Sequence, residues 1–346
     1  MPATRDFAKI IMNHEIMGLT SMVICFEDAI DVKDLPLAEK NAIDNVNLLM
    51  EAMNKGTLSR EELPLVFFRV RSVEQFEALV DKINSDIAKV LAGFVFPKFS
   101  TMNGSAYFSC LERLNVKYNE ILYGMPILES VEIALKETRN GELMSIKNIV
   151  DHYKNLVLNI RVGSTDFSSC FGVRRGIDYS IYDILTVRDC LLDILNVFSR
   201  NNDYVISGPV WEYFLASKGM KFNKNLEFSW QSSLLKRKRL INEAIDGLLR
   251  EVILDKANGF IGKTAIHPTH IKYINAMQAV TEEEYNDVVQ ILNTSGGVIK
   301  SPGQNKMNEI NPHRSWAIKM YNKARAYGVI KDETGYLKLI SDEDFK

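Results

Sequence analysis

The chain has 346 residues, of which 46% are hydrophobic and 25% charged, so it can bury one large core or two ordinary ones. Its formal net charge of -2 gives no electrostatic reason to expect nucleic acid or a membrane surface as a partner. The four cysteines form no C-x-x-C pair, which argues against a disulfide framework or zinc site and fits a reducing cytoplasm. No apolar run reaches the ~18 residues of a membrane-spanning helix, and charges from Arg5 onward leave no room for a signal peptide core.

Short apolar strands alternate with amphipathic helices along most of the chain. The predicted strands are 22–28, 63–71, 92–98, 121–130, 157–162, 204–208 and 259–268. The predicted helices are 7–17, 36–53, 73–90, 105–118, 130–153, 180–199 and a helical region ending near residue 256. This alternation predicts a parallel α/β fold, and polar groups after many strands favour a (β/α)8 TIM barrel over an open doubly wound sheet.

Residues 277–346 have a different character. A Gly/Ser/Pro-rich connection at 294–303 precedes a predicted helix at 316–330. We expect this part to be a helical extension or lid that packs on the barrel or on a neighbouring subunit. The predicted domains are therefore a barrel over 1–276 and an extension over 277–346.

Ionisable side chains stand at the carboxyl ends of most predicted strands, where parallel α/β folds bind ligands. They are Glu27, Asp28, Arg69, Arg71, Lys98, Glu129, Asp166 and, in the last loop, Lys263 and His267. Acids and bases at successive strand ends indicate a site for an anionic substrate and a metal ion.

Glu129 and Asp166 are the candidate metal ligands, since Mg²⁺ often takes only one or two carboxylates and completes its shell with substrate and water. Taken singly, each acid is better explained as a helix N-cap or a first-turn acid. Arg69 is a candidate substrate clamp, because its guanidinium can hold a carboxylate by two parallel hydrogen bonds. The alternative for Arg69 is an internal ion pair with Glu27 or Asp28. His267 is a candidate acid/base group, although a histidine before proline more often shapes a loop.

Seven sequence pieces, in the correct order over about residues 2–275, resemble the citrate lyase beta-subunit family. This family is also called the HpcH/HpaI aldolase family and includes malyl-CoA and citramalyl-CoA lyases. The pieces are PATR at 2–5, FEDAI at 26–30, FRVR at 68–71, FPK at 96–98, ILES at 127–130, GSTDFSSCFG at 163–172 and GFIGKTAIHPTHI at 259–271.

The resemblance implies a TIM barrel that assembles as trimers or hexamers and makes or breaks carbon–carbon bonds with Mg²⁺, for which Mn²⁺ is an alternative. It also implies that Glu129 and Asp166 bind the metal ion and that Arg69 binds the substrate. Lys98, Glu27 and Asp28 fall at further positions of the family's site. Lys98 and Asp28 are therefore candidate catalytic residues beside Arg69, and Glu27 and His267 are candidate substrate-binding residues.

The sequence departs from the family pattern at three positions in or directly beside these pieces. Arg71 replaces an asparagine, Cys25 an aspartate and His270 a glutamine. An insertion at 172–183 adds Arg174 and Arg175 after the metal loop. The added positive charge predicts a more anionic substrate, phosphorylated in one version of the hypothesis, and argues against the family's usual CoA thioester. Arg174 and Arg175 are thus candidate substrate-binding residues.

The start of the chain also differs, because Met1 stands at the last residue of the family's first barrel strand. We expect that strand to be truncated or missing, and the natural chain to begin upstream of this Met1, since an open barrel leaves unpaired strand edges.

The sequence therefore predicts a cytoplasmic, homo-oligomeric, Mg²⁺-dependent carbon–carbon lyase or aldolase. Its substrate would be a small 2-oxo or β-hydroxy acid, or a thioester of one, reacting through an enolate. One alternative is a Mg²⁺-dependent barrel enzyme for a phosphorylated or phosphoenolpyruvate-like substrate. The other is a non-catalytic barrel subunit.

Overall fold

The computed structural model describes residues 1–214 and 229–340. The chain forms two compact units, which we call the sheet unit and the C-terminal unit. The sheet unit comprises Met1–Arg175, Ile181–Phe198 and Val205–Val210, and the C-terminal unit comprises Gly176–Ser180, Ser199–Tyr204 and Trp211–Lys346. The predicted domain boundary between residues 276 and 277 stays a prediction.

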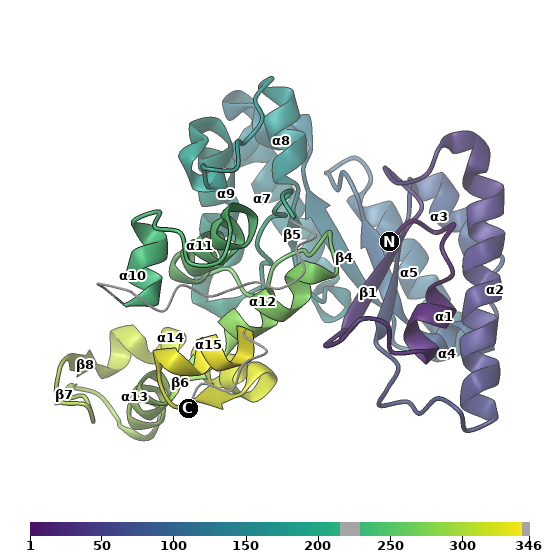
Figure 1. Ribbon diagram of the computed structural model, residues 1–346. Helices are drawn as coiled ribbons and strands as arrows, with labels where there is room; N and C mark the ends of the chain where they lie inside the picture. Colours follow the sequence, from purple (N-terminus) through teal and green to yellow (C-terminus); the bar gives the residue numbers. More distant parts are fainter. Residues whose placement is uncertain (215–228, 341–346) are drawn as a thin grey trace. The chain divides into compact units, whose positions relative to one another are not determined.

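The sheet unit is built on five parallel strands whose order in the sheet is their order in the chain (Figure 1). They are β1 Ser21–Cys25, β2 Leu65–Arg69, β3 Leu91–Phe96, β4 Tyr123–Leu128 and β5 Arg161–Val162. A helical crossover follows each strand, and strands added one by one in chain order are the arrangement of a (β/α)8 barrel. The predicted α/β barrel class is confirmed.

Backbone hydrogen bonds add one parallel position at each edge of this sheet. At one edge the Cys25 amide donates to the Met1 carbonyl at 2.8 Å, so the N-terminal residues lie beside β1. At the other edge the Ser207 amide donates to the Ile160 carbonyl at 3.0 Å. The predicted strand at 204–208 is thus reduced to a single bridge, but it holds the next place after β5.

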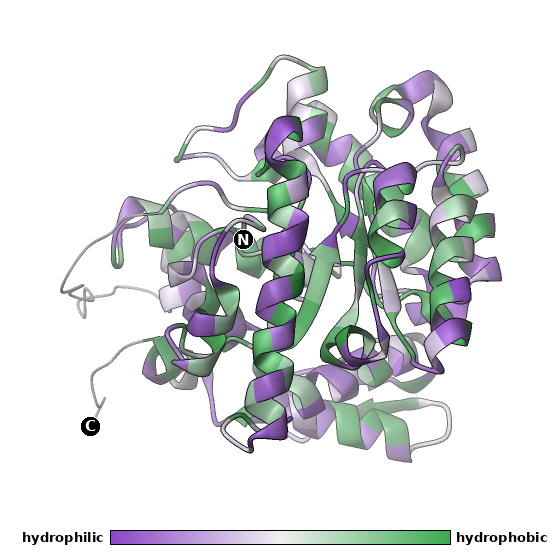
Figure 2. Cartoon of the chain, turned by 90° about the vertical axis from the view of Figure 1, so that its right-hand side faces the viewer, coloured by the Kyte–Doolittle hydropathy of each residue, from purple (hydrophilic) through white to green (hydrophobic). Residues whose placement is uncertain are grey.

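Helices and short 3-10 turns connect the strands of the sheet unit. The helices are α1 Phe7–Met12, α2 Leu35–Asn54, α3 Val73–Val80, α4 Ser85–Val90, α5 Gly104–Tyr118, α6 Val131–Ala134, α7 Lys136–His152, α8 Ser164–Cys170 and α9 Leu185–Phe198. The 3-10 turns of the described residues are η1 Val32–Asp34, η2 Lys154–Leu156, η3 Ile181–Asp183 and η4 Arg200–Asn202. In Figure 2 the strands are largely apolar, whereas the long helix α2 carries both polar and apolar residues.

Two of the predicted helices are interrupted. The helix predicted at 73–90 divides because the Asn84 side chain accepts the Ile87 amide at 2.9 Å and starts α4. The helix predicted at 130–153 divides at Leu135, whose backbone is extended with φ -77° and ψ 127°. In both places a local backbone break overrides an amphipathic pattern that continues across it.

The two faces of the sheet carry different side chains. One face packs a set of aromatic rings against the helices, with Phe96 stacked on Tyr107 of α5 at 4.6 Å between centroids. The other face, which we call the interior face, holds a smaller apolar cluster of Phe67, Val95, Met125 and Ile127. Because side chains alternate along a strand, Arg69 shares the interior face with Phe67 two residues before it.

The C-terminal unit is mainly helical. Its helices are α10 Trp230–Leu235, α11 Glu243–Asn258, α12 Thr269–Gln278, α13 Glu282–Asn293, α14 Ile310–Tyr327 and α15 Glu333–Ile340. Two small sheets pair β6 Val280–Thr281 with β9 Val329–Ile330, and β7 Val298–Lys300 with β8 Met307–Glu309. A core around Trp211, Trp230 and Tyr336 joins α10, α11, α12 and α15, and a second cluster joins α13 and α14. The helix predicted at 316–330 starts earlier and ends at Tyr327.

The strand predicted at 259–268 is wrong, because none of the strands in the described residues includes it. Gly259 ends α11 with φ +96°, and Gly262 has φ +69°. Left-handed backbone at two positions prevents an extended run, although the sequence GFIG looks strand-like. None of the described helices is long and apolar enough to cross a membrane.

Gly93 tests the tight spacing between β3 and β4. Its φ is +152°, and a Cβ there would lie 1.9 Å from the Tyr123 carbonyl oxygen. We expect Gly93→Ala to lower the free energy of unfolding by about 3 kcal/mol or more, because backbone must move. Gly141→Ala in α7, where a Cβ meets nothing within 4 Å, should instead raise it by about 0.5–1 kcal/mol.

Urea unfolding followed by circular dichroism measures both changes. A Gly93→Ala variant as stable as wild type would contradict the strand spacing described above.

Candidate active site

Arg69 is the centre of a cluster of charges at the carboxyl ends of the strands. One of its terminal nitrogens pairs with the Glu27 carboxylate, with Asp28 Oδ2 at 3.2 Å and with Glu129 Oε1 at 3.6 Å. Burial opposes the charge of Arg69, but Glu27 and Glu129 outweigh it and raise the pKa of the guanidinium. The internal ion pair considered for Arg69 is present, and it joins three of the predicted site acids.

Lys98 connects the same acids from the loop after β3. Its Nζ donates to Glu27 Oε1 at 2.9 Å, and its backbone amide donates to Glu129 Oε1 at 2.9 Å. The hydrogen bond with Glu27 raises the pKa of the Lys98 ammonium. Lys98 has φ +47°, an unusual conformation for a residue with a side chain. Rarely populated backbone conformations such as this one cluster at active sites and ligand-binding loops.

Glu129 and Asp166 come from neighbouring strand ends and act on each other electrostatically. Glu129 directly follows β4 and is buried, whereas Asp166 lies in the first turn of α8. Burial, together with the negative charge of Asp166, raises the pKa of Glu129 to about 7. Gly163 leaves room for the Glu129 carboxylate, because a Cβ there would lie 2.2 Å from Glu129 Oε2. Asp166 is therefore both a first-turn acid and a neighbour of Glu129.

This pair of carboxylates fits a hard divalent ion. The described residues hold no group of three His, Cys, Asp or Glu side chains that could bind a metal without help. Mg²⁺ does not need such a group, because water and substrate oxygens commonly fill most of its six positions. A cation between Glu129 and Asp166 would also remove the repulsion that helps to raise the pKa of Glu129.

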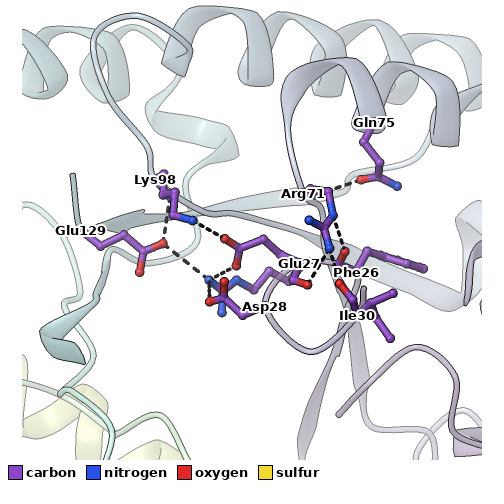
Figure 3. Close-up of polar contacts among 9 residues, drawn as sticks. Phe26, Glu27, Asp28, Ile30, Arg71, Gln75, Lys98 and Glu129 are labelled. Atoms are coloured by element: carbon purple, nitrogen blue, oxygen red, sulfur yellow. Dashed lines mark hydrogen bonds and ion pairs between the residues drawn. The ribbon is translucent and has the colours of Figure 1, made fainter. Parts of the chain in front are cut away.

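Arg71 holds the loop that carries two of the acids. We call residues 26–30 the acid loop. The Arg71 guanidinium donates to the carbonyls of Phe26 at 3.1 Å, of Glu27 at 3.0 Å and of Ile30. The Arg71 amide is itself bound by Gln75 Oε1 at 3.0 Å (Figure 3). The residue that departs from the family pattern thus fixes the backbone of the acid loop.

Sequence reasoning missed Arg161. It lies on β5 opposite Ile127 of β4, and it interacts electrostatically with Arg69 and Glu129. Burial and the nearby Arg69 lower the pKa of Arg161 to about 10. The available signal was a single charge inside the mostly apolar run 157–162, at a position where burial makes a charge costly.

The arginines of the insertion have different surroundings. Arg174 is exposed, whereas Arg175 is buried and donates to the Val210 carbonyl at 2.8 Å. That bond ties Arg175 to the end of the sheet unit's last segment. Substrate binding by Arg174 and Arg175 stays a prediction.

His267 and Lys263 belong to the C-terminal unit. His267 Nδ1 lies 2.8 Å from Thr269 Oγ1, and its ring stacks on Phe214 with 3.9 Å between centroids. These contacts shape the loop before α12. Lys263 is buried between Glu251 and Asp255, with 2.8 Å to each carboxylate. Lys263 is thus held by internal ion pairs. A substrate-binding role for His267 stays a prediction.

Comparison with known proteins identifies the family. A family model described as C-C bond lyase of the TIM-barrel fold matches residues 1–329. The chain belongs to this family. The match confirms the resemblance to a divergent branch of carbon–carbon bond lyases. None of the curated proteins is significantly similar to the chain.

Two solved structures, CitE and malate synthase, show the same fold at low identity. CitE from Mycobacterium tuberculosis, in complex with magnesium, acetoacetate and coenzyme A, has a TM-score of 0.54 and 14% identity, with 94% of this chain and 96% of CitE covered. Malate synthase from Haloferax volcanii has a TM-score of 0.51 and 11% identity, with 78% of this chain and 70% of the synthase covered. RipC from Yersinia pestis has a TM-score of 0.49 and 17% identity, with coverages of 80% and 91%.

The Arg71 contacts predict a specific loss. We expect Arg71→Gln to lower the free energy of unfolding by about 2 kcal/mol or more, since three carbonyls lose a charged donor. Hydrogen–deuterium exchange should speed up in peptides covering residues 26–31. Arg113→Gln is the matched control, because Arg113 forms an exposed pair with Glu77 at 3.3 Å and should change stability by less than about 0.5 kcal/mol. Unchanged exchange in the acid loop would show that Arg71 does not hold it.

His270, a second departure from the family pattern, predicts a pH dependence of the C-terminal unit. It is fully buried, and its Nε2 lies 3.1 Å from the Tyr213 carbonyl, so Nε2 is the donor. Burial, together with nearby His267 and Lys263, lowers the pKa of His270 to about 4. Between pH 6.5 and 4 the unfolded chain binds a proton that the folded chain does not, so stability must fall as pH falls.

The expected loss over that window is up to about 3 kcal/mol. Denaturation followed by tryptophan fluorescence suits this test, because all three tryptophans lie in the C-terminal unit. His270→Gln should flatten the pH dependence of stability between pH 4 and 6.5. His152 is an exposed residue of α7, and His152→Gln should leave the pH dependence unchanged. An equally steep curve for His270→Gln would rule His270 out as its source.

Proposed function

We propose that the chain is a Mg²⁺-dependent carbon–carbon lyase or aldolase that cleaves or forms a small β-hydroxy acid or a thioester of one. The observation that carries the proposal is the pair Glu129 and Asp166 beside Arg69 and Lys98, all at the carboxyl ends of consecutive parallel strands. Membership of the carbon–carbon bond lyase family supports the reaction class. The magnesium and acetoacetate in the CitE complex support a hard cation and a small acid.

Glu129 and Asp166 would hold the ion, which, when bound, polarises a carbonyl oxygen of the substrate as a Lewis acid. Burial of Glu129 favours this, because a buried carboxylate of raised pKa gains most from a neighbouring positive charge. The Lys98 amide fixes Glu129 Oε1, and Gly163 leaves room for Glu129 Oε2. The carboxylate is therefore oriented before any ligand arrives.

Arg69 would bind a carboxylate of the substrate. Its bonds to the acids use one terminal nitrogen, and its buried Nε has no acceptor among the described residues. An unpaired buried donor is costly, and a substrate carboxylate would supply the missing acceptor. Arg69 and Lys98 would then face the negative charge that develops on the enolate oxygen when the carbon–carbon bond breaks.

Asp28 is the acid of this cluster that remains open. Its side chain is 63% exposed, compared with 5% for Glu27, although both pair with Arg69. We assign Asp28 to contact with the reacting part of the substrate and Glu27 to the position of Arg69 and Lys98. Arg71 supports both roles by fixing the acid loop.

The test is calorimetric titration of Mg²⁺, followed by pyruvate, glyoxylate, oxaloacetate and phosphoenolpyruvate with and without the ion. We expect Asp166→Ala to weaken Mg²⁺ binding by at least the roughly 10–100-fold typical of losing even an outer-shell partner. Asp86→Ala is the matched control, since Asp86 is an exposed first-turn acid of α4 and should leave binding unchanged.

Metal-dependent binding of a 2-oxo acid that is lost in Asp166→Ala would support the lyase. Wild type that binds neither the ion nor a 2-oxo acid would overturn it in favour of the non-catalytic barrel. Binding restricted to phosphorylated acids would favour the phosphoenolpyruvate-like alternative.

A further inference from the structure

Arg161 lies on the interior face of the sheet. In the register of β4 and β5, Arg161 is opposite Ile127, which belongs to the interior apolar cluster with Phe67 and Val95. Arg69 is opposite Val95 in the register of β2 and β3 and follows Phe67 by two residues. Opposite residues of neighbouring strands share a face, so the two arginines point to the same side of the sheet.

The electrostatics agree with this placement. Burial and the positive charge of Arg69 lower the pKa of Arg161, while Glu129 and Cys25 act in the opposite direction. Cys25 is opposite Arg69 in the register of β1 and β2. Arg161 therefore lies close to Arg69 and Glu129, below the carboxyl ends of the strands.

Two half-buried guanidinium groups of like charge that lie close together need a reason. Like charges repel, and each guanidinium loses hydration when it is buried. Arg69 Nε also lacks an acceptor among the described residues, while the opposite side of the same group is bound by acids. A guanidinium carries five N–H donors, so each arginine can serve a ligand in addition to its protein partners.

We propose that Arg69 and Arg161 together bind a second anionic group of the substrate, so that the site selects small acids with two anionic groups. This inference rests on the proposed function: the carboxylate assigned there to Arg69 is this second group, and the first is the carboxylate next to the carbonyl that the metal ion would polarise. The second group is a carboxylate or a phosphoryl group, since the fork of a guanidinium matches both. Arg161 is thereby a residue that determines specificity.

Three ligands that share one 2-oxo acid core test the selection. They are 2-oxobutyrate, oxaloacetate and phosphonopyruvate, which differ only in a terminal methyl, carboxylate or phosphonate group. We expect wild type to bind at least one dianion about tenfold or more tightly than 2-oxobutyrate, as a charged hydrogen bond provides. Whichever of oxaloacetate and phosphonopyruvate has the lower Kd identifies the second group as a carboxylate or a phosphoryl group.

Arg161→Gln should reduce the preference for the dianion to about twofold or less and change the Kd for 2-oxobutyrate and for Mg²⁺ by less than about twofold. Arg161→Lys, which keeps the charge but not the fork, should give an intermediate preference. Arg113 is an exposed residue of α5, and Arg113→Gln is the matched control that should bind all three ligands like wild type. A merely structural role for Arg161 would weaken all three ligands equally.

Repeating each titration with and without Mg²⁺ separates the two proposals. Metal-dependent binding with no dianion preference in wild type, or with the preference kept in Arg161→Gln, overturns this inference and leaves the lyase standing. A dianion preference that needs Arg161 but not Mg²⁺ overturns the metal-dependent function and supports the arginine pair. If Arg161→Gln does not fold, the wild-type preference and Arg161→Lys decide the matter.

Discussion

The ion pairs of Arg69 are the interaction on which the site depends. Glu27 and Glu129 come from strands on either side of β2 and β3, and each is almost completely buried. Two buried carboxylates need a nearby positive charge to offset the loss of hydration, and Arg69 on the interior face provides it. Lys98 completes the arrangement by binding both acids, one through its side chain and one through its backbone. The strand ends are thus held in register by charge as well as by backbone hydrogen bonds.

Departures from the family pattern become intelligible once the contacts are known. An asparagine at position 71 could not donate to three carbonyls at once, whereas the longer Arg71 does so and fixes the acid loop. His270 replaces a glutamine, is neutral, and remains bonded to the Tyr213 carbonyl. Both changes keep backbone hydrogen bonding satisfied while altering size and charge. They concern the support of loops, so they do not by themselves redefine the chemistry.

Much of the sheet unit could be predicted from the sequence, because buried strands and helix faces have distinct apolar periods. Glu129 was found because it ends an apolar run, and Asp166 because it follows a glycine turn. Arg161 could not be found this way, since its meaning depends on which residue lies opposite it on β4. The stretch 259–268 failed because its pattern is strand-like while Gly259 and Gly262 adopt positive φ. Periodicity reports burial, but register and backbone handedness need the folded chain.

Stability and binding are opposed at Glu129 and Asp166. Their repulsion, added to burial, raises the pKa of Glu129 to about 7, which means that the fold holds this acid in an environment that disfavours its charge. Gly163 leaves room for Glu129 in this position, because a Cβ there would lie 2.2 Å from Glu129 Oε2. A cation that binds only the folded chain would offset the unfavourable free energy of these two carboxylates, so its binding would stabilise the native state. The same two carboxylates that weaken the isolated fold are therefore the ones that make a bound cation favourable.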